Sequence, residues 1–250
     1  MPAMPASAHV PTTLISLRPA GEHGAMRRAA ARHGLAMLAV SPWRLQMRED
    51  AITRAALAQA LAAPVVVFTS PAAVRAAQAP GPLTPTPGAH WLAVGEGSAR
   101  ALRRAGVVDV VQPTRMDSEG LLALPALAAA ARVGLVTAPG GRGVIAVELA
   151  RRGSEVVRAD VYERVPLRLS PATVRRLRAL AGPTVLAISS GEALVRVLDQ
   201  LPADLLARWQ AQPVVAVSDR LAALAAERGF GRIVRAEGPR PAQLLAAASA

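Results

Sequence analysis

Residues 65–74 read VVVFTSPAAV, and residues 185–194 repeat the pattern as VLAISSGEAL. Both begin with a short apolar run typical of a buried strand, continue through hydroxyl side chains and enter a segment of helical composition. Ser70 and Ser190 hold the same place in the two stretches and lie 120 residues apart. A buried strand that leads directly into a helix is the building unit of a parallel α/β sheet.

Two further pairs of segments recur on either side of this one. Around Gly34, AARHGLAMLAV resembles LARRGSEVV around Gly153, 119 residues later. WLAVGEGSARALRRAG, which ends at Gly106, resembles VVAVSDRLAALAAERG, which ends at Gly229, 123 residues later. Three pairs in one order and at nearly one spacing indicate an internal duplication. Copies of this length are domains rather than solenoid repeats, so we predict two similar α/β domains.

Strand-like and helix-like segments alternate along the whole chain, which predicts parallel sheets covered by helices. The helix-like segments are rich in Ala, Leu and Arg, as in ALAQALAA and SARALRRAG. The predicted strands are TLISL (13–17), VVVFT (65–69), WLAV (91–94), VVDVV (107–111), RVGLVT (132–137), EVVRA (155–159), TVLAI (184–188), PVVAV (213–217) and RIVRA (232–236).

The composition argues against several kinds of site. There is no cysteine, hence no disulfide, thiol nucleophile or thiolate metal site. The four histidines are scattered without ligand spacing, so we expect no metal and no metal-dependent chemistry. No apolar run approaches the ~18 residues of a membrane span. The opening residues MPAMPASAHVPTT lack the basic and apolar regions of a signal peptide, so we expect a cytoplasmic protein.

Arginine is the only strongly basic residue type in the chain, which contains no lysine. The net charge is +12, and all 29 basic residues are Arg, which excludes a Schiff-base lysine and the lysine of a phosphate-binding loop. The planar guanidinium fork suits carboxylates and phosphates. Biased codon usage is an equally good explanation of the excess, and both stay open. Aromatic residues are 2% of the chain, too few for the stacking that single-stranded nucleic acids require.

Candidate binding residues follow the predicted strands, since ligands of open α/β sheets bind beyond the carboxyl ends of the strands. Each hydroxyl there is either a helix N-cap or part of a cleft that accepts acidic groups, and the sequence leaves both readings open. The strand ends in question are Arg18-Pro19, Thr69-Ser70, Gly95 to Ser98, Pro139 to Arg142, Ser189-Ser190 and Ser218-Asp219-Arg220.

Two motifs are weaker than they look. VGEGSAR contains G-x-G after a strand, but it lacks the third glycine of a dinucleotide site, so we expect no nucleotide cofactor. There is no G-x-S-x-G elbow for a serine hydrolase. Asp117 and Glu119, which flank Ser118, are typical of a helix start rather than of a catalytic carboxylate pair.

Tyr162, in ADVYERVPL, is the single tyrosine of the chain. It follows the last predicted strand of the middle block, in an extended segment. One interpretation is a half-buried packing residue with a satisfied hydroxyl. The other is a hydroxyl at a cleft, which is protonated at neutral pH and is able to donate a proton to a leaving group.

A set of short motifs occurs in one order along the chain. These are LRP (17–19), FTSPAAV (68–74), AVGEGSARAL (93–102), SEGLL (118–122) after Pro113, GGR (140–142), L-x-x-x-G (149–153), VYER (161–164), ISS (188–190) and VSDRL (217–221). By the order and spacing of these motifs the chain, from about residue 13 to 245, resembles the uroporphyrinogen-III synthase family. The chain departs from the family pattern at Ala72, where Asn is usual, at Ser98, where Thr is usual, and in VSDRL, which replaces a Gly-x-x-Thr turn.

The resemblance implies two flavodoxin-like domains with parallel sheets, joined by a two-stranded ladder. The first domain would be discontinuous and the second continuous. In residue numbers, the first would contain 1–40 and 168–250, the second 48–159, and the ladder 41–47 and 160–167, within SPWRLQM and VYERVPL. Such an arrangement exchanges a terminal element between the two copies of the repeat and leaves a hinge and a cleft near Tyr162.

The resemblance also implies an activity, that of a cyclising hydro-lyase without a cofactor. Hydroxymethylbilane, a linear tetrapyrrole with eight carboxylates, would close to uroporphyrinogen III with loss of water and inversion of ring D. Tyr162 would assist departure of the hydroxyl. The substrate would be held by Arg18, Thr69, Ser70, Ser98, Arg142, Ser189, Ser190, Ser218 and Arg220.

The same resemblance implies a monomer that contacts hydroxymethylbilane synthase transiently and binds neither nucleic acid nor membrane. The alternative from a different class is a non-enzymatic, bilobed anion-binding or regulatory module. Such a module would need the cleft but not the tyrosine.

Overall fold

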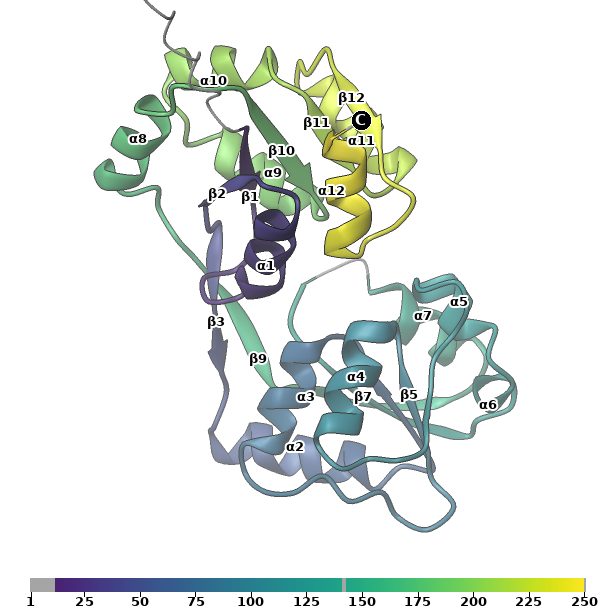
Figure 1. Cartoon of the computed structure of the whole chain (residues 1–250). Helices are drawn as coiled ribbons and strands as arrows, with labels where there is room; N and C mark the ends of the chain where they lie inside the picture. Colours follow the sequence, from purple (N-terminus) through teal and green to yellow (C-terminus); the bar gives the residue numbers. More distant parts are fainter. Residues whose placement is uncertain (1–11, 141–142, 250) are drawn as a thin grey trace, which may run out of the picture. The chain divides into compact units, whose positions relative to one another are not determined.

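The computed structural model describes residues 12–140 and 143–249, which cluster into two compact units. Unit 1 contains the described residues up to Arg44 and those from Pro166 onward, and unit 2 is Leu45–Val165. Figure 1 shows that unit 1 combines the purple start of the chain with its green and yellow last third, whereas unit 2 is one continuous stretch.

A two-stranded sheet is formed by β3 (Trp43–Met47) and β9 (Tyr162–Pro166). The Arg48 N–H donates to the Val161 carbonyl at 3.0 Å near one end, and the Leu167 N–H donates to the Pro42 carbonyl at 2.9 Å near the other. These bonds show that the strands run in opposite directions. The ladder predicted within SPWRLQM and VYERVPL is therefore confirmed.

Unit 2 contains a five-stranded parallel sheet in the order β6-β5-β4-β7-β8. Its strands are β4 (Val65–Phe68), β5 (His90–Ala93), β6 (Val110–Val111), β7 (Arg132–Thr137) and β8 (Glu155–Asp160). All four residues of β4 are buried, as the unbroken apolar run predicts for a central strand covered on both faces.

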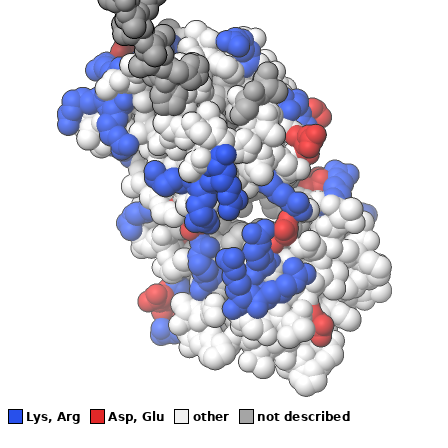
Figure 2. Space-filling view, viewed as in Figure 1, with Lys and Arg blue, Asp and Glu red and all other residues white. Residues whose placement is uncertain are grey.

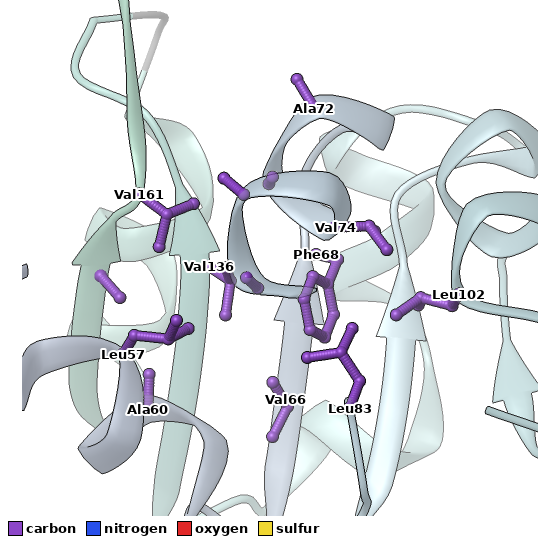
Figure 3. Packing of buried hydrophobic residues seen from close by; sticks show 14 of the residues in the cluster. Leu57, Ala60, Val66, Phe68, Ala72, Val74, Leu83, Leu102, Val136 and Val161 are labelled. Carbon is purple, nitrogen blue, oxygen red and sulfur yellow. The ribbon is translucent and has the colours of Figure 1, made fainter. Parts of the chain in front are cut away.

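Helices cover both faces of this sheet. The first face packs against α2 (Ala51–Leu61), α3 (Pro71–Gln78) and α4 (Glu96–Arg104), and the second against α5 (Ser118–Leu122), α6 (Pro125–Ala128) and α7 (Val144–Arg151). Alternate strand residues supply the two cores: Val66 and Phe68 belong to the first, Val65 and Val67 to the second. Figure 3 shows Val66 and Phe68 in the first of these cores.

Gly134 in β7 permits an unusually close approach of α2. A Cβ at this position would lie 1.9 Å from the Ala60 carbonyl oxygen, far inside van der Waals contact. Ala60 itself is fully buried at the carboxyl end of α2. Residue 134 must therefore be glycine for the helix to pack on this strand in the observed way.

Unit 1 contains the matching parallel sheet, in the order β12-β11-β10-β1-β2. Its strands are β1 (Thr13–Ser16), β2 (Ala36–Ala39), β10 (Thr184–Ile188), β11 (Val214–Ala216) and β12 (Ile233–Arg235). Its helices are α1 (Gly24–Arg32), α8 (Pro171–Arg178), α9 (Gly191–Leu198), α10 (Ala203–Gln210), α11 (Asp219–Glu227) and α12 (Pro241–Ser249). One core cluster joins α1, α12 and the middle strands.

The two sheets have the same arrangement of strands in space, but the chain passes through these strands in a different order in each unit. Numbered along its own chain, unit 1 has the order 2-1-3-4-5 of flavodoxin-like sheets, whereas unit 2 has the order 3-2-1-4-5. Central strands correspond, because β1 pairs with β10 in unit 1 as β7 pairs with β4 in unit 2. The predicted α/β fold with two parallel sheets and a ladder is confirmed.

The repeated residues have the same structural roles in both copies. Ser70 and Ser190 are the N-caps of α3 and α9. Four glycines with left-handed backbone conformation lie between a helix and the following strand. They are Gly34 (φ 67°), Gly106 (φ 93°), Gly153 (φ 87°) and Gly229 (φ 86°). The sequence repeat thus reports cap serines and turn glycines, the positions at which local geometry restricts the residue type.

Two strand predictions need correction. Of the run VVDVV, only Val110–Val111 pairs in the sheet, because Val107 packs into the core and Val108 is 83% exposed on the connection from α4. The segment AMLA, which was not among the predicted strands, forms β2 at the sheet edge. Its two alanines have weak strand preference, so pairing with β1 decides its conformation.

Candidate active site

A pocket of about 190 Å³ lies in unit 2, at the carboxyl ends of β4, β7 and β8 and the start of α7. This is the sheet edge at which ligands of parallel α/β sheets bind. Its polar side chains are Thr69, Ser70, Ser118, Thr137, Arg158, Tyr162 and Arg164, and Gly140 and Gly143 expose backbone to it.

Tyr162 and Ser70 form the central contact of this pocket. The Tyr162 Oη and the Ser70 Oγ share a hydrogen bond of 3.0 Å, and the Tyr162 side chain is 4% exposed. The Ser70 Oγ also accepts a bond of 3.0 Å from the Ala73 N–H at the start of α3. The cap fixes the serine oxygen, and the serine in turn fixes the phenol oxygen at the pocket wall. The packing interpretation holds, since the residue is buried and its hydroxyl is hydrogen-bonded, whereas proton donation by Tyr162 stays a prediction.

A second pair of hydroxyls lies beside the first. The Thr69 hydroxyl donates to the Thr137 Oγ1 at 2.8 Å, across the neighbouring strands β4 and β7. Because Thr137 accepts this bond, its own proton is available for another acceptor. Sequence reasoning named Thr69 but not Thr137, although RVGLVT was a predicted strand that ends in a hydroxyl residue.

Two arginines that were not predicted from the sequence, Arg158 and Arg164, line the pocket. The Arg158 guanidinium bonds the Asp160 carboxylate through Nε at 3.0 Å and Nη2 at 2.9 Å, and Nη2 also donates to the Ala138 carbonyl at 3.1 Å. Arg164 approaches the Gly140 turn, where a Cβ would lie 3.9 Å from its Nη1. These side chains give the pocket a positive wall, which suits a carboxylate ligand. Arg164 belongs to the VYER motif and was within reach of the sequence analysis.

The amino end of α7 completes the pocket. Gly143 is its N-cap with left-handed backbone (φ 66°), and Val144, Ile145 and Ala146 of the first turn line the cavity. The N–H groups of a first helical turn lack acceptors within the helix and favour anions. Arg142, predicted to bind substrate, lies outside the described residues.

A family model for uroporphyrinogen-III synthase HemD matches residues 24–246, most of the chain. The chain belongs to the uroporphyrinogen-III synthase family. Two curated family members are similar in sequence: uroporphyrinogen-III synthase of Salmonella typhimurium is 32% identical over 145 residues, and that of Escherichia coli is 31% identical over 144 residues. The alignments cover 56% of this chain and only 59% and 58% of these relatives.

Two solved structures show the same fold. A mutant uroporphyrinogen III synthase from Thermus thermophilus has a TM-score of 0.60 at 19% identity, over 94% of this chain and 96% of that one. The synthetase from Helicobacter pylori 26695 has a TM-score of 0.62 at 14% identity, over 95% and 98%. At such identities the likeness speaks for the fold alone.

Ser98, a further site residue predicted from the sequence, is 4% exposed in the first turn of α4. The N-cap of α4 is Gly95, three residues earlier, and Ser98 is not among the residues that line the pocket. The interpretation of this hydroxyl as a helix cap at a strand end is therefore wrong. The capping position is the glycine because the turn after β5 ends earlier than the G-x-G-S pattern suggested.

The remaining site residues predicted from the sequence lie in unit 1. Ser190 caps α9 through the Ala193 N–H at 3.2 Å, and Ser218 caps α11 through the Leu221 N–H at 3.3 Å. Ser189 is exposed. Arg220 lies near the start of α9, since a Cβ at Gly191 would be 3.6 Å from its Nη1. The N-cap interpretation thus holds for Ser190 and Ser218, as it does for Ser70.

Arg18, which follows β1, is the last of these unit 1 candidates. Its Nε is buried and has no hydrogen-bond partner in the part of the chain that the structure describes. Burial lowers the pKa of the guanidinium, and the nearby Glu22 carboxylate acts in the opposite direction. A desolvated guanidinium with a spare donor is suited to an anionic ligand.

His23 was not among the site residues predicted from the sequence. Its Nδ1 lies 3.1 Å from the Ser16 Oγ and its Nε2 lies 3.0 Å from the Ser41 Oγ, and the residue is 6% exposed. Burial lowers its pKa, and the positive charges of Arg18 and Arg27 lower it further. The lowered pKa favours the neutral imidazole, which hydrogen-bonds Ser16 at the end of β1 and Ser41 after β2.

Among residues 12–140 and 143–249, no group of three His, Asp or Glu side chains is placed to hold a metal ion. In the same part of the chain, no helix is both long and apolar enough to cross a membrane.

Proposed function

We propose that this chain is a uroporphyrinogen-III synthase, which closes hydroxymethylbilane to uroporphyrinogen III with loss of water and inversion of ring D. Family membership supports the reaction class. The observation that carries the assignment of the site is the Ser70–Tyr162 hydrogen bond at the wall of the unit 2 pocket, beside two arginines.

The proposed role of Tyr162 is general acid catalysis. As the carbon–oxygen bond of the hydroxymethyl group breaks, the phenol donates its proton to the departing oxygen, which leaves as water. The electrons for this step come from the adjacent pyrrole nitrogen. The Ser70 hydroxyl is able to donate to the phenolate oxygen that forms and so to stabilise it. The phenolate regains a proton when the cyclised product loses one.

Binding of substrate carboxylates is proposed for the cations and hydroxyls of both units. In unit 2, Arg158, Arg164 and the first turn of α7 would hold carboxylate groups, with Thr69 and Thr137 as hydroxyl donors. In unit 1, the enclosed guanidinium of Arg18 is the best suited. The weaker proposals for substrate binding are Ser98, Ser189, Ser190, Ser218 and Arg220.

Selectivity for the inverted product would come from holding a flexible substrate in one folded pose. Such an orientation effect needs many weak contacts rather than one strong group. The proposed reaction has no net change of oxidation state, and we propose that it proceeds without a cofactor. We further propose a cytoplasmic monomer that receives its substrate by transient contact with hydroxymethylbilane synthase.

The test supplies hydroxymethylbilane generated in situ and separates the type I and type III products after oxidation. We expect type III product in proportion to enzyme. Type I product alone, the outcome of uncatalysed closure, would rule out the synthase. If the chain instead retained the tetrapyrrole without forming type III product, the non-enzymatic anion-binding module would be the correct class.

A further inference from the structure

The unit 2 pocket is small for the proposed substrate. Its volume of about 190 Å³ is below the ~300 to ~1,000 Å³ of sites that enclose a drug-sized ligand, and a linear tetrapyrrole is larger still. Of the two arginines that line it, Arg158 already bonds the Asp160 carboxylate. The pocket therefore has room and charge for only part of a substrate with eight carboxylates.

A groove begins beside this pocket, at Pro71, the residue after Ser70 of the pocket wall. Its volume is about 210 Å³, and it lies between α3 and α4. Gly97 lies opposite, so close that a Cβ there would be 3.3 Å from the Pro71 ring. The groove then runs along the two helices, past Arg75 on α3 and Arg100 and Arg104 on α4.

The two helices that form this groove carry a strong excess of positive charge. Their sequences, PAAVRAAQ and EGSARALRR, hold four arginines and one acidic residue, Glu96. Figure 2 shows basic side chains gathered on the surface over α3 and α4. Arg100 bonds the Glu96 carboxylate at 3.0 Å, one turn nearer the start of α4, with side chains that are 57% and 31% exposed. Such a surface ion pair is weak and leaves the guanidinium able to bind a second carboxylate.

The position of each arginine along its helix sets what it is able to reach. Arg75 and Arg100 lie about one helical turn, ~5 Å, beyond Pro71 and Gly97, whereas Arg104 lies about one turn farther along α4. Helical side chains also lean toward the amino end of their helix, which brings the first two arginines toward the pocket side of the groove. A carboxylate on a short side arm of a ligand at the sheet edge would reach the first turn and not the second.

We propose that the start of the α3–α4 groove is a second anion subsite, in which Arg75 and Arg100 bind a carboxylate arm of the substrate. The proposal rests on the proposed synthase function. It names side chains outside the pocket as binding residues and assigns them no part in the chemical step.

The experiment measures steady-state formation of type III product by the full chain and its Arg75→Gln/Arg100→Gln double variant. We expect KM for hydroxymethylbilane to rise about three- to tenfold with kcat unchanged, as for the loss of binding shared by the ground and transition states. Arg103→Gln is the matched control, because Arg103 is exposed on α4, donates to the Val110 carbonyl and does not line the groove. It should leave KM unchanged.

Three results would overturn the proposal: an unchanged KM in the double variant, an equal rise in the Arg103→Gln control, or an equal rise in Arg104→Gln. The last would indicate a longer occupant, such as an acidic segment of a partner protein. A wild-type chain that forms no type III product would instead refute the synthase function. The subsite would then be tested by titration with uroporphyrin III, followed by its fluorescence. Weaker binding to the double variant than to the control supports the subsite, and equal binding refutes it.

Discussion

The same strand-to-helix junction occurs in both units, with different surroundings. In unit 2, the Ser70 Oγ caps α3 and also bonds the Tyr162 hydroxyl. In unit 1, the Ser190 Oγ caps α9 by accepting a hydrogen bond from the Ala193 N–H. Among the described residues, no hydrogen bond from a tyrosine reaches Ser190. Counting back the 119 residues that separate Gly34 from Gly153 gives Trp43 as the counterpart of Tyr162 and Arg18 as that of Thr137. The duplication kept the cap and changed what touches it.

Net positive charge is larger in unit 1, whereas the hydrogen-bonded hydroxyl pairs described above lie in unit 2. Unit 1 has sixteen arginines and seven acidic residues, whereas unit 2 has thirteen and ten. Unit 1 therefore carries most of the net positive charge, and unit 2 carries the network of hydroxyls. Two copies of one fold thus differ in their polar side chains: unit 2 has the Ser70–Tyr162 and Thr69–Thr137 hydrogen bonds, and unit 1 has the larger excess of arginine over acidic residues.

The largest expected effect is on stability, and it compares a substitution in the central strand β7 of unit 2 with one at the matching position in unit 1. Gly134→Ala places a methyl group against the Ala60 carbonyl oxygen, so we expect it to lower the free energy of unfolding by more than about 3 kcal/mol. The counterpart in unit 1, Ile15, is a fully buried side chain, and Ile15→Val should cost only about 1 kcal/mol. Denaturant titration of both variants measures this, and similar losses would show that α2 is free to shift away.

The next effect tests whether proton donation belongs to unit 2. Tyr162→Phe removes the phenol proton and keeps the buried ring, so we expect kcat to fall about 100-fold with little change in KM. The thermal midpoint should change little, because Ser70 still caps α3. An unchanged kcat would make Tyr162 a packing residue and remove the main difference between the units.

A smaller effect compares the two cap serines directly. Ser70→Ala and Ser190→Ala should each destabilise the chain by about 1 kcal/mol through loss of a helix cap. Only Ser70→Ala should also lower kcat, by about fivefold, since it removes the partner of the Tyr162 hydroxyl. Stability and kcat measured on both variants decide the matter, and equal losses of kcat would give both junctions the same role.

The smallest effect concerns pH. The pKa of His23 in unit 1 is lowered, so the unfolded chain takes up a proton more readily and stability falls as pH drops below about 6.5. In unit 2, hydrogen bonds from Arg151 and Arg152 lower the pKa of Glu148 to about 2, so its contribution persists until pH falls below about 4.5.

Thermal midpoints between pH 7.5 and 5 should therefore fall by up to about 4 °C in the wild type. The decrease should be smaller in His23→Gln, because glutamine at this position does not titrate. An identical decrease in both proteins would assign the effect to other groups.

Sequence reasoning found those parts of the fold and site that depend on neighbours along the chain. The central apolar strands were predicted, and a helix cap was one of the two interpretations of Ser70, Ser190 and Ser218, because a cap selects a residue type within a few positions. The glycines marked the repeat, and their left-handed backbone was not predicted. β2 and the short extent of β6 were missed, since both are edge strands whose pairing depends on a partner elsewhere. In the pocket, Ser70, Thr69 and Tyr162 were named, whereas Thr137, Arg158 and Arg164 were not.

The sequence by itself determined the alternation of strands and helices, the duplication and the residues that end each strand. Only the tertiary structure decided which of those ends meet. Tyr162 reaches Ser70 across 92 positions, and Thr69 reaches Thr137 across 68. Thr69 and Thr137 meet because β4 and β7, which are far apart in the chain, are neighbours in the sheet. Local patterns report the torsion angles and burial of a segment, whereas the position of a strand in a sheet depends on packing summed over the whole unit.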